Sequence, residues 1–280
     1  MDFALNYSPQ AVALLQAGRL EVDLFKCPDW PDLVAEARRF RPVYVHFPLR
    51  AGDGSAAGTD WALVDHFLTT TETRYVDLHI VPRLRDFPDA QTAADLNEMA
   101  FRAVMVDVEQ AVRRYGCERV IVENAPLRQD RSVEDFVPGA VEPAFFHRVV
   151  EAAGCGLLLD VAHARIAART LGTDEHDYLD AMPLYALREL HLTGVQPVNG
   201  ELTDHTGFTD ADWTAAEWVA GRLRAGAWPL PGLVALEYGG VGPHFEWRSD
   251  SAVIAADAPR LYALFHSLGL PADERFPGNP

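Results

Sequence analysis

GLLLDVAHA, residues 156–164, places two polar side chains directly after a run of apolar ones. Residues 156–160 lack the polar alternation of a half-exposed strand, as is typical of a parallel strand buried on both faces. The run ends in Asp160, and His163 follows three residues later. The segment therefore predicts a buried strand whose carboxyl end carries a carboxylate and an imidazole.

Short apolar runs of this kind alternate with longer amphipathic segments along the chain, the pattern of repeated βα units. The predicted strands cover residues 3–6, 21–25, 43–47, 75–80, 120–123, 156–160, 188–192 and 233–237. The longest predicted helices cover residues 89–115, 209–224 and 251–268. Eight strands with intervening helices in 280 residues predict an α/β fold, a single (β/α)8 TIM barrel that spans residues 1–280. No GxGxxG or Walker A pattern follows a strand, so neither a dinucleotide site nor a P-loop is supported.

Side chains that suit metal ions end six consecutive predicted strands. Because TIM barrels build their active sites at the carboxyl ends of the strands, we expect these side chains on one rim. The predicted metal ligands are His46, His79, Glu123, Asp160, His163, His191, Asp204, His205 and Glu237. Within this set, Glu123, Glu237 and His163 are the predicted catalytic residues.

Carboxylates that crowd a barrel mouth repel one another unless a positive charge holds them together. Lys and Arg are scarce at these strand ends, so divalent cations are the natural counter-charge for residues such as Glu123 and Asp160. A carboxylate that bridges two metals about 3.5–4 Å apart is the usual way to assemble such a centre. We therefore expect two or three divalent transition metal ions at this rim.

Other polar side chains on the same rim are candidates for contact with a substrate. The predicted substrate contacts are Asn6, Lys26, Asn124 and Tyr238. His244 and Trp247 lie in the loop after the last predicted strand and are further candidates. Each of these side chains also fits a purely structural role in its loop.

The excess of acidic over basic residues limits the kinds of molecule that the protein can bind. The chain has 24 Lys and Arg residues against 41 acids and a net charge of −17, whereas binding to nucleic acid or an anionic membrane needs clustered basic residues. No apolar run approaches the roughly 18 residues that span a bilayer, and residues 1–18 lack the basic start of a signal peptide. Cys27, Cys117 and Cys155 form neither a disulfide framework nor a CxxC pair. We expect a cytoplasmic protein that binds neither nucleic acid nor a membrane.

At these residues the chain resembles the xylose isomerase-like TIM-barrel superfamily, the group that includes endonuclease IV. LDVAHARIAA, residues 159–168, is similar to that enzyme's Asp-x-x-His motif. The order of metal ligands in that enzyme continues here with HLTG at residues 191–194, the DH pair at residues 204–205 and Glu237 at the end of the last strand. VHFPLRAG, VIVEN and ELHLTG also resemble the multinuclear non-haem iron-dependent oxidative enzymes, relatives that modify peptide residues. Thr203 stands where endonuclease IV has an aspartate, and Asp204 instead adjoins His205. We therefore expect two metals in preference to three.

The resemblance to the oxidative enzymes implies two or three iron ions, with Glu123 as the bridge, and an O₂-dependent modification of a peptide or small-molecule substrate. A partner protein that delivers the peptide fits this interpretation, and zinc or manganese are the alternative metals. The same barrel also suits divalent-metal-dependent isomerisation or epimerisation of a sugar. Zinc-dependent hydrolysis of a phosphodiester is disfavoured by the net charge. A catalytically silent barrel that binds a partner is disfavoured because the ligand set is intact.

Overall fold

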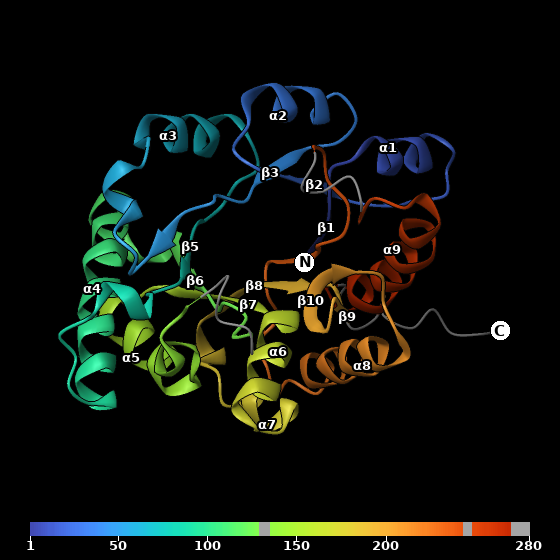
Figure 1. The fold of residues 1–280 in the computed structure, drawn as a ribbon. Coiled ribbons are helices and arrows are strands. Elements are labelled where there is room, and N and C mark those ends of the chain that lie inside the picture. The colour runs from blue at the N-terminus through green and yellow to red at the C-terminus, as the bar shows by residue number, and fades with distance from the viewer. Residues whose placement is uncertain (129–134, 243–247, 270–280) are drawn as a thin grey trace.

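Parallel strands form one curled sheet in the centre of the molecule, and helices surround it on the outside (Figure 1). The computed structural model describes residues 1–128, 135–242 and 248–269. The strands of the sheet are β1 Asp2–Asn6, β2 Leu24–Cys27, β3 Val43–Val45, β4 Arg50–Ala51, β5 Val76–Ile80, β6 Val120–Glu123, β7 Gly156–Asp160, β8 Leu187–Leu192 and β11 Leu233–Leu236. Their order is β3-β2-β1-β11-β8-β7-β6-β5-β4, and neighbouring strands are parallel throughout.

All eight predicted strands are present, with ends that shift by up to three residues. The third predicted strand, residues 43–47, corresponds to β3 alone, and β4 follows it as a short strand that was not predicted. β3 pairs with β2, whereas β4 pairs with β5. Backbone hydrogen bonds continue across the break, from His46 to the carbonyl of Cys27 and from His79 to the carbonyl of Leu49. The prediction of a TIM barrel is thus confirmed in part: the sheet is parallel, curled and covered by helices.

The helices are α1 Pro9–Gln16, α2 Pro31–Ala37, α3 Trp61–Thr70, α4 Ala93–Tyr115, α5 Pro143–Ala153, α6 Val161–Leu171, α7 Glu175–Asp180, α8 Asp210–Arg224 and α9 Ser251–His266. Proline begins the first turn of α1, α2 and α5, and glycine follows the last residue of α4, α5 and α6, as is common at helix ends. Short 3₁₀ turns cover Ser55–Gly58, Leu84–Asp86, Cys117–Arg119, Pro138–Val141, Leu184–Ala186 and Ser267–Gly269. The longest helix, α4, begins later than predicted because the Thr92 side chain caps it by accepting from Asp95 N. Within the described residues, no helix has both the length and the apolarity to cross a membrane.

The inside of the curled sheet is divided into an apolar floor and a polar upper layer. The floor is the cluster of Ala4, Leu24, Tyr44, Leu233 and Ala235. Along β5, Val76, Leu78 and Ile80 join the main core under the helices, whereas Asp77 and His79 do not. Since strand side chains alternate between faces, Asp77 and His79 share the inner face of the sheet. The fold therefore directs polar side chains inward at the carboxyl ends of the strands.

A two-stranded antiparallel hairpin follows β8. Its strands are β9 Gly194–Val198 and β10 Glu201–Thr206. The turn between them is Asn199-Gly200, and both residues have positive φ, as a tight two-residue hairpin turn requires. This hairpin carries Asp204 and His205, two of the predicted ligands, in a region where no strand was predicted.

Candidate metal centre

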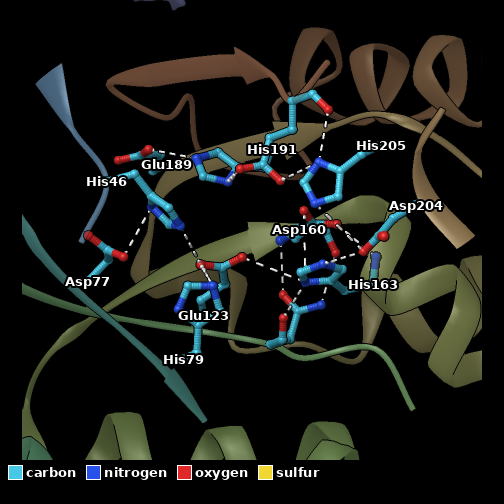
Figure 2. Close-up of polar contacts among 12 residues, drawn as sticks. His46, Asp77, His79, Glu123, Asp160, His163, Glu189, His191, Asp204 and His205 are labelled. Atoms are coloured by element: carbon cyan, nitrogen blue, oxygen red, sulfur yellow. Dashed lines mark hydrogen bonds and ion pairs between the residues drawn. The ribbon is translucent and has the colours of Figure 1, made fainter. Parts of the chain in front are cut away.

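Five histidines and six carboxylates meet inside the sheet at the carboxyl ends of its strands (Figure 2). We call this set the polar cluster: His46, Asp77, His79, Glu123, Asp160, His163, Glu189, His191, Asp204, His205 and Glu237. All nine predicted metal ligands belong to it. Asp77 and Glu189 are members that sequence analysis missed, although each precedes a predicted histidine ligand by two residues and so shares its face of the strand.

His46, His79 and Glu123 converge on what we call the first position. His79 Nε2 lies 3.0 Å and His46 Nε2 3.5 Å from the same oxygen, Oε2 of Glu123. The other ring nitrogens are held from behind: His46 Nδ1 lies 3.0 Å from Asp77 Oδ2, and His79 Nδ1 lies 3.3 Å from the carbonyl of Leu49. Metal-binding histidines are commonly oriented in this way, with one nitrogen on a carboxylate or carbonyl and the other on the metal.

His163, Asp204 and His205 form a second position. Asp204 Oδ2 lies 2.9 Å from His163 Nε2 and 4.0 Å from His205 Nε2. Backbone carbonyls again hold the opposite nitrogens, because His163 Nδ1 is 2.8 Å from the carbonyl of Asn124 and His205 Nδ1 is 3.0 Å from that of Glu237. A carbonyl only accepts hydrogen bonds, so both rings carry a proton on Nδ1 and turn Nε2 toward Asp204.

A β-bulge explains how two adjacent residues of β10 reach the same position. Thr203 and Thr206 are three residues apart, but their partners in β9 are only two residues apart, so β10 holds one extra residue. His205 has a φ of 55°, in the left-handed region that non-glycine residues rarely adopt. Adjacent strand residues normally point to opposite faces, and the bulge removes that restriction for Asp204 and His205. The place of Asp204 directly before His205 is therefore compatible with a role at this position.

His191 and Glu237, with His46 close by, define a third position. His191 Nδ1 lies 3.2 Å from Glu237 Oε1, and its Nε2 lies 2.8 Å from Glu189 Oε1. Lys26 reaches the same place from β2: its ammonium is in contact with Glu237 Oε1 and lies 3.4 Å from His191 Nδ1. The third position therefore already contains a positive charge.

Glu123 lies between the first position and the Nδ1 side of the His163 ring, whose Nε2 faces the second position. Its Oε2 faces His46 and His79, whereas its Oε1 lies 3.6 Å from His163 Nδ1 and close to Asp160. The side chain is 1% exposed, and neither oxygen accepts a hydrogen bond from the described residues. Asp160 Oδ2 is in the same situation. Buried carboxylate oxygens without donors are costly unless a cation binds them, so the cluster fits divalent metal ions.

Burial shifts the titration of the cluster toward neutral side chains. Burial, reinforced by Asp160 and Asp77, raises the pKa of Glu123 well above its usual range. Burial, with the charge of Lys26, lowers the pKa of His46 and of His191 well below theirs. These imidazoles are thus neutral near pH 7 and keep the lone pair that a metal requires.

His163 and Asp204 form the exception to this trend. Burial opposes the charged form of His163, but Asp160 and Asp204 outweigh it and raise the pKa of His163 to about 10. Burial also opposes the charged form of Asp204, yet His205 and His163 hold the pKa of Asp204 well below its usual value. This ion pair compensates the second position in the absence of metal, and a metal ion has to displace the proton of His163.

A cavity of about 270 Å³ opens beside the polar cluster. His46, His79, Glu123, His163, His205 and Glu237 line its inner side. Its outer wall is largely apolar and includes Pro28, Trp30, Leu33 and Val241. A substrate in this cavity can therefore touch the polar cluster on one side and apolar side chains on the other.

The four predicted substrate contacts are divided between two environments. Asn6 and Lys26 line the cavity. Asn124 is fully buried, and its amide joins β6 to β7 by bonding the backbone N–H and carbonyl of Asp160, at 2.9 Å each. Tyr238 is also buried, and its hydroxyl accepts from Asp250 N at the start of α9. Neither is among the residues that line this cavity. His244 and Trp247 lie outside the described residues.

One family of known proteins matches the central part of the chain. Residues 92–219 match the RiPP precursor modification enzymes MbnB/TglH/ChrH. The match covers β6 and β7, and hence Glu123, Asp160 and His163, as well as the hairpin with Asp204 and His205. The resemblance predicted from the sequence is thereby confirmed.

Curated relatives are similar over part of their length. A UPF0276 protein of Caulobacter vibrioides is 31% identical over 162 residues, which are 55% of this chain and 51% of the relative. The chain thus spans about half the length of the curated relatives that it matches.

Solved structures share the fold at low sequence identity. An AP endonuclease of family 2 from Brucella melitensis is 16% identical with a TM-score of 0.50, covering 92% of this chain and 99% of that one. A 3-keto-D-glucoside 4-epimerase from E. coli is 15% identical with the same TM-score of 0.50, covering 91% and 98%. At these identities the likeness shows the fold alone.

Proposed function

We propose that this protein is a metal-dependent oxidative enzyme that modifies a peptide, with two metal ions held at the first and second positions and Glu123 between them. The observation that carries the proposal is Glu123 itself. It is buried, and its two oxygens lack hydrogen-bond donors among the described residues. Its Oε2 lies 3.0 Å from His79 Nε2, and its Oε1 lies 3.6 Å from Nδ1 of His163, the ring whose Nε2 faces the second position. A carboxylate in this situation fits a bridge between two cations.

Iron is the metal that we propose, because mixed histidine and carboxylate ligation with open positions suits iron and chemistry with O₂. The chain's own residues orient the ligands and control access to them. The carbonyl of Leu49 lies 3.3 Å from His79 Nδ1, and Asp77 Oδ2 lies 3.0 Å from His46 Nδ1, so that Nε2 of each ring faces Glu123. The apolar outer wall excludes water from one side of the substrate, which strengthens electrostatic interactions in the site.

A peptide substrate is supported by the family match, since the matched proteins modify RiPP precursors, which are ribosomally synthesised peptides. The cavity fits a peptide side chain better than a whole peptide, because its volume is about 270 Å³. An apolar residue of the peptide next to the reacting side chain would contact Trp30 and Leu33.

We further propose that β3 and β4 act as one strand, so that residues 43–51 complete an eight-stranded barrel around the site.

The test measures bound metal and oxygen use together. After anaerobic reconstitution with iron, zinc or manganese and removal of free metal, we expect about two equivalents of metal per chain. Less than one equivalent with every metal contradicts the proposal. Consumption of O₂ by the iron-loaded protein with a candidate precursor peptide supports oxidation. Turnover of a sugar by the manganese-loaded protein, without use of O₂, establishes the isomerase alternative instead.

A further inference from the structure

Lys26 is the only lysine in the sequence, and it lies inside the polar cluster. Its side chain extends from β2 and is buried, at 5% exposure. The ammonium is in contact with Glu237 Oε1 and lies 3.4 Å from His191 Nδ1. His191 and Glu237 belong, with His46, to one of the residue groups whose ligand atoms lie close enough together to hold a metal ion.

We propose that the ammonium of Lys26 is the resident cation of the third position, so that the chain binds metal only at the first and second positions. This inference rests on the proposed function, which places metal ions at those two positions. It assigns to Lys26 a role in setting the number of metals rather than in contacting a substrate.

The third position cannot hold Lys26 and a metal ion together. A transition metal binds histidine nitrogen and carboxylate oxygen at about 2.0–2.2 Å, and the ammonium uses the same lone pairs of His191 and Glu237. The tautomer of His191 also suits the ammonium. Nε2 lies 2.8 Å from Glu189 and donates to it, so Nδ1 is left to accept from Lys26.

The choice of lysine fits the space inside the sheet. Every other basic residue in the sequence, apart from the histidines, is an arginine, whose planar guanidinium is broad and binds carboxylates side-on. The lysine ammonium is a compact point charge, and it occupies the volume between Glu237 and His191 that an ion would fill.

The charges of the cluster are consistent with two metal ions and one ammonium. The polar cluster contains six carboxylates, and Arg128 pairs with one of them, Asp204, at 3.2 Å. Arg248 is also buried beside the cluster and interacts with Asp204. Two divalent ions together with Lys26, Arg128 and Arg248 therefore carry at least as many positive charges as the six carboxylates carry negative ones. A third divalent ion would leave the buried site with excess positive charge, which low-dielectric surroundings disfavour.

The first experiment compares metal content between the wild type, Lys26→Met and Arg74→Met. Methionine keeps the length of lysine and removes its charge, and Arg74 is an exposed cation that pairs with Asp2 outside the cluster. After reconstitution with Fe(II) or Zn²⁺, elemental analysis should find about one more equivalent in Lys26→Met than in the wild type, and no change in Arg74→Met. Equal content in Lys26→Met and the wild type overturns the inference while leaving the proposed function intact. Less than one equivalent in the wild type contradicts both.

The second experiment uses the wild type, so it decides the matter even where Lys26→Met does not fold. Protein with ¹³C- and ¹⁵N-labelled lysine gives the side-chain signals of Lys26 alone, because the sequence has one lysine. During titration with diamagnetic Zn²⁺, we expect these signals to keep the shifts of a buried, ion-paired ammonium up to saturation. Movement to the shifts of a solvated lysine shows that metal displaces Lys26 from Glu237, and refutes the inference.

Discussion

Glu123→Gln separates a metal-binding role of Glu123 from a structural one, because the two roles predict opposite changes in the metal-free protein. The substitution keeps the size of the side chain and removes its charge. Without metal, the carboxylate is buried at 1% exposure, lacks donors among the described residues, and has a pKa that burial raises well above the usual range. Replacing it with a neutral amide should therefore stabilise the metal-free protein, by about 1–2 kcal/mol.

For a chain of this size, 1 kcal/mol corresponds to about 2–4 °C in the melting temperature, so the metal-free variant should melt about 2–8 °C higher than the metal-free wild type. The wild type should gain about 2.7 kcal/mol from metal at 100 times its Kd, or about 5–11 °C. Glu123→Gln should lose most of this gain, because the proposed bridge between the two positions is absent.

Differential scanning calorimetry of both proteins, with chelator and with metal, measures the two effects. Asp257→Asn is the matched control, because Asp257 is also buried but accepts from Phe208 N at 2.9 Å outside the polar cluster. It should lose about 1 kcal/mol with and without metal and keep the metal-dependent gain. If metal-free Glu123→Gln melts below the wild type, or keeps the full gain from metal, then Glu123 is structural and the reasoning fails.

Three further predictions concern the surroundings of the metal positions. Burial raises the pKa of Asp77 to about 8. The carboxylates near His163 outweigh the effect of burial and raise its pKa to about 10. Between pH 6.5 and 8 the folded metal-free protein therefore binds more protons than the unfolded chain. The melting temperature of the metal-free protein should therefore fall as the pH rises from 6.5 to 8, while the increase in melting temperature on metal binding grows. A melting temperature that stays constant or rises over this range, measured by calorimetry, contradicts this prediction. Asp77→Asn, which releases His46, should weaken metal binding about 10–100-fold in a chelator competition. Glu189→Gln should weaken metal binding much less, because Glu189 orients His191, which faces Lys26 and not a metal ion. If Asp77→Asn and Glu189→Gln weaken metal binding equally, the assignment of Lys26 to the third position is contradicted. Gly194→Ala should remove metal from the second position alone, because a Cβ at residue 194 would lie 2.2 Å from the carbonyl oxygen of Gly207 beside the hairpin. Gly221→Ala is the control: a Cβ there meets no atom within 4 Å, so this variant should keep its full metal content.

Much of the site could be predicted because it follows from strand position. The carboxyl ends of parallel strands meet on one rim, so a side chain at the end of β6, such as Glu123, is placed by its strand alone. Asp77 and Glu189 could also have been found, since alternation along a strand puts each on the face of the histidine two residues later. The hairpin after β8 had a local signal as well, because Asn199-Gly200 is a strong turn sequence between two short extended runs.

Other features depend on three-dimensional distances that no local pattern encodes. The contact between Lys26 and Glu237 crosses the inside of the sheet and joins residues far apart in the chain. The short strand β4 lies beyond the third predicted strand and is defined by its pairing with β5, which the local sequence does not reveal. The two hydrogen bonds between the amide of Asn124 and the backbone of Asp160 likewise join residues on different strands, so the sequence around Asn124 does not reveal them.

The backbone of His205 shows how the second position is built at an energetic cost. A non-glycine residue in the left-handed region costs of order 1–3 kcal/mol, and such strain persists only where the surroundings enforce it. Here the bulge in β10 and the bond from Nδ1 to the carbonyl of Glu237 enforce it. A regular β10 would avoid the strain but would turn either Asp204 or His205 away from His163. The strain is thus explained by the need for both side chains at one position, which is what a metal ion with three protein ligands requires.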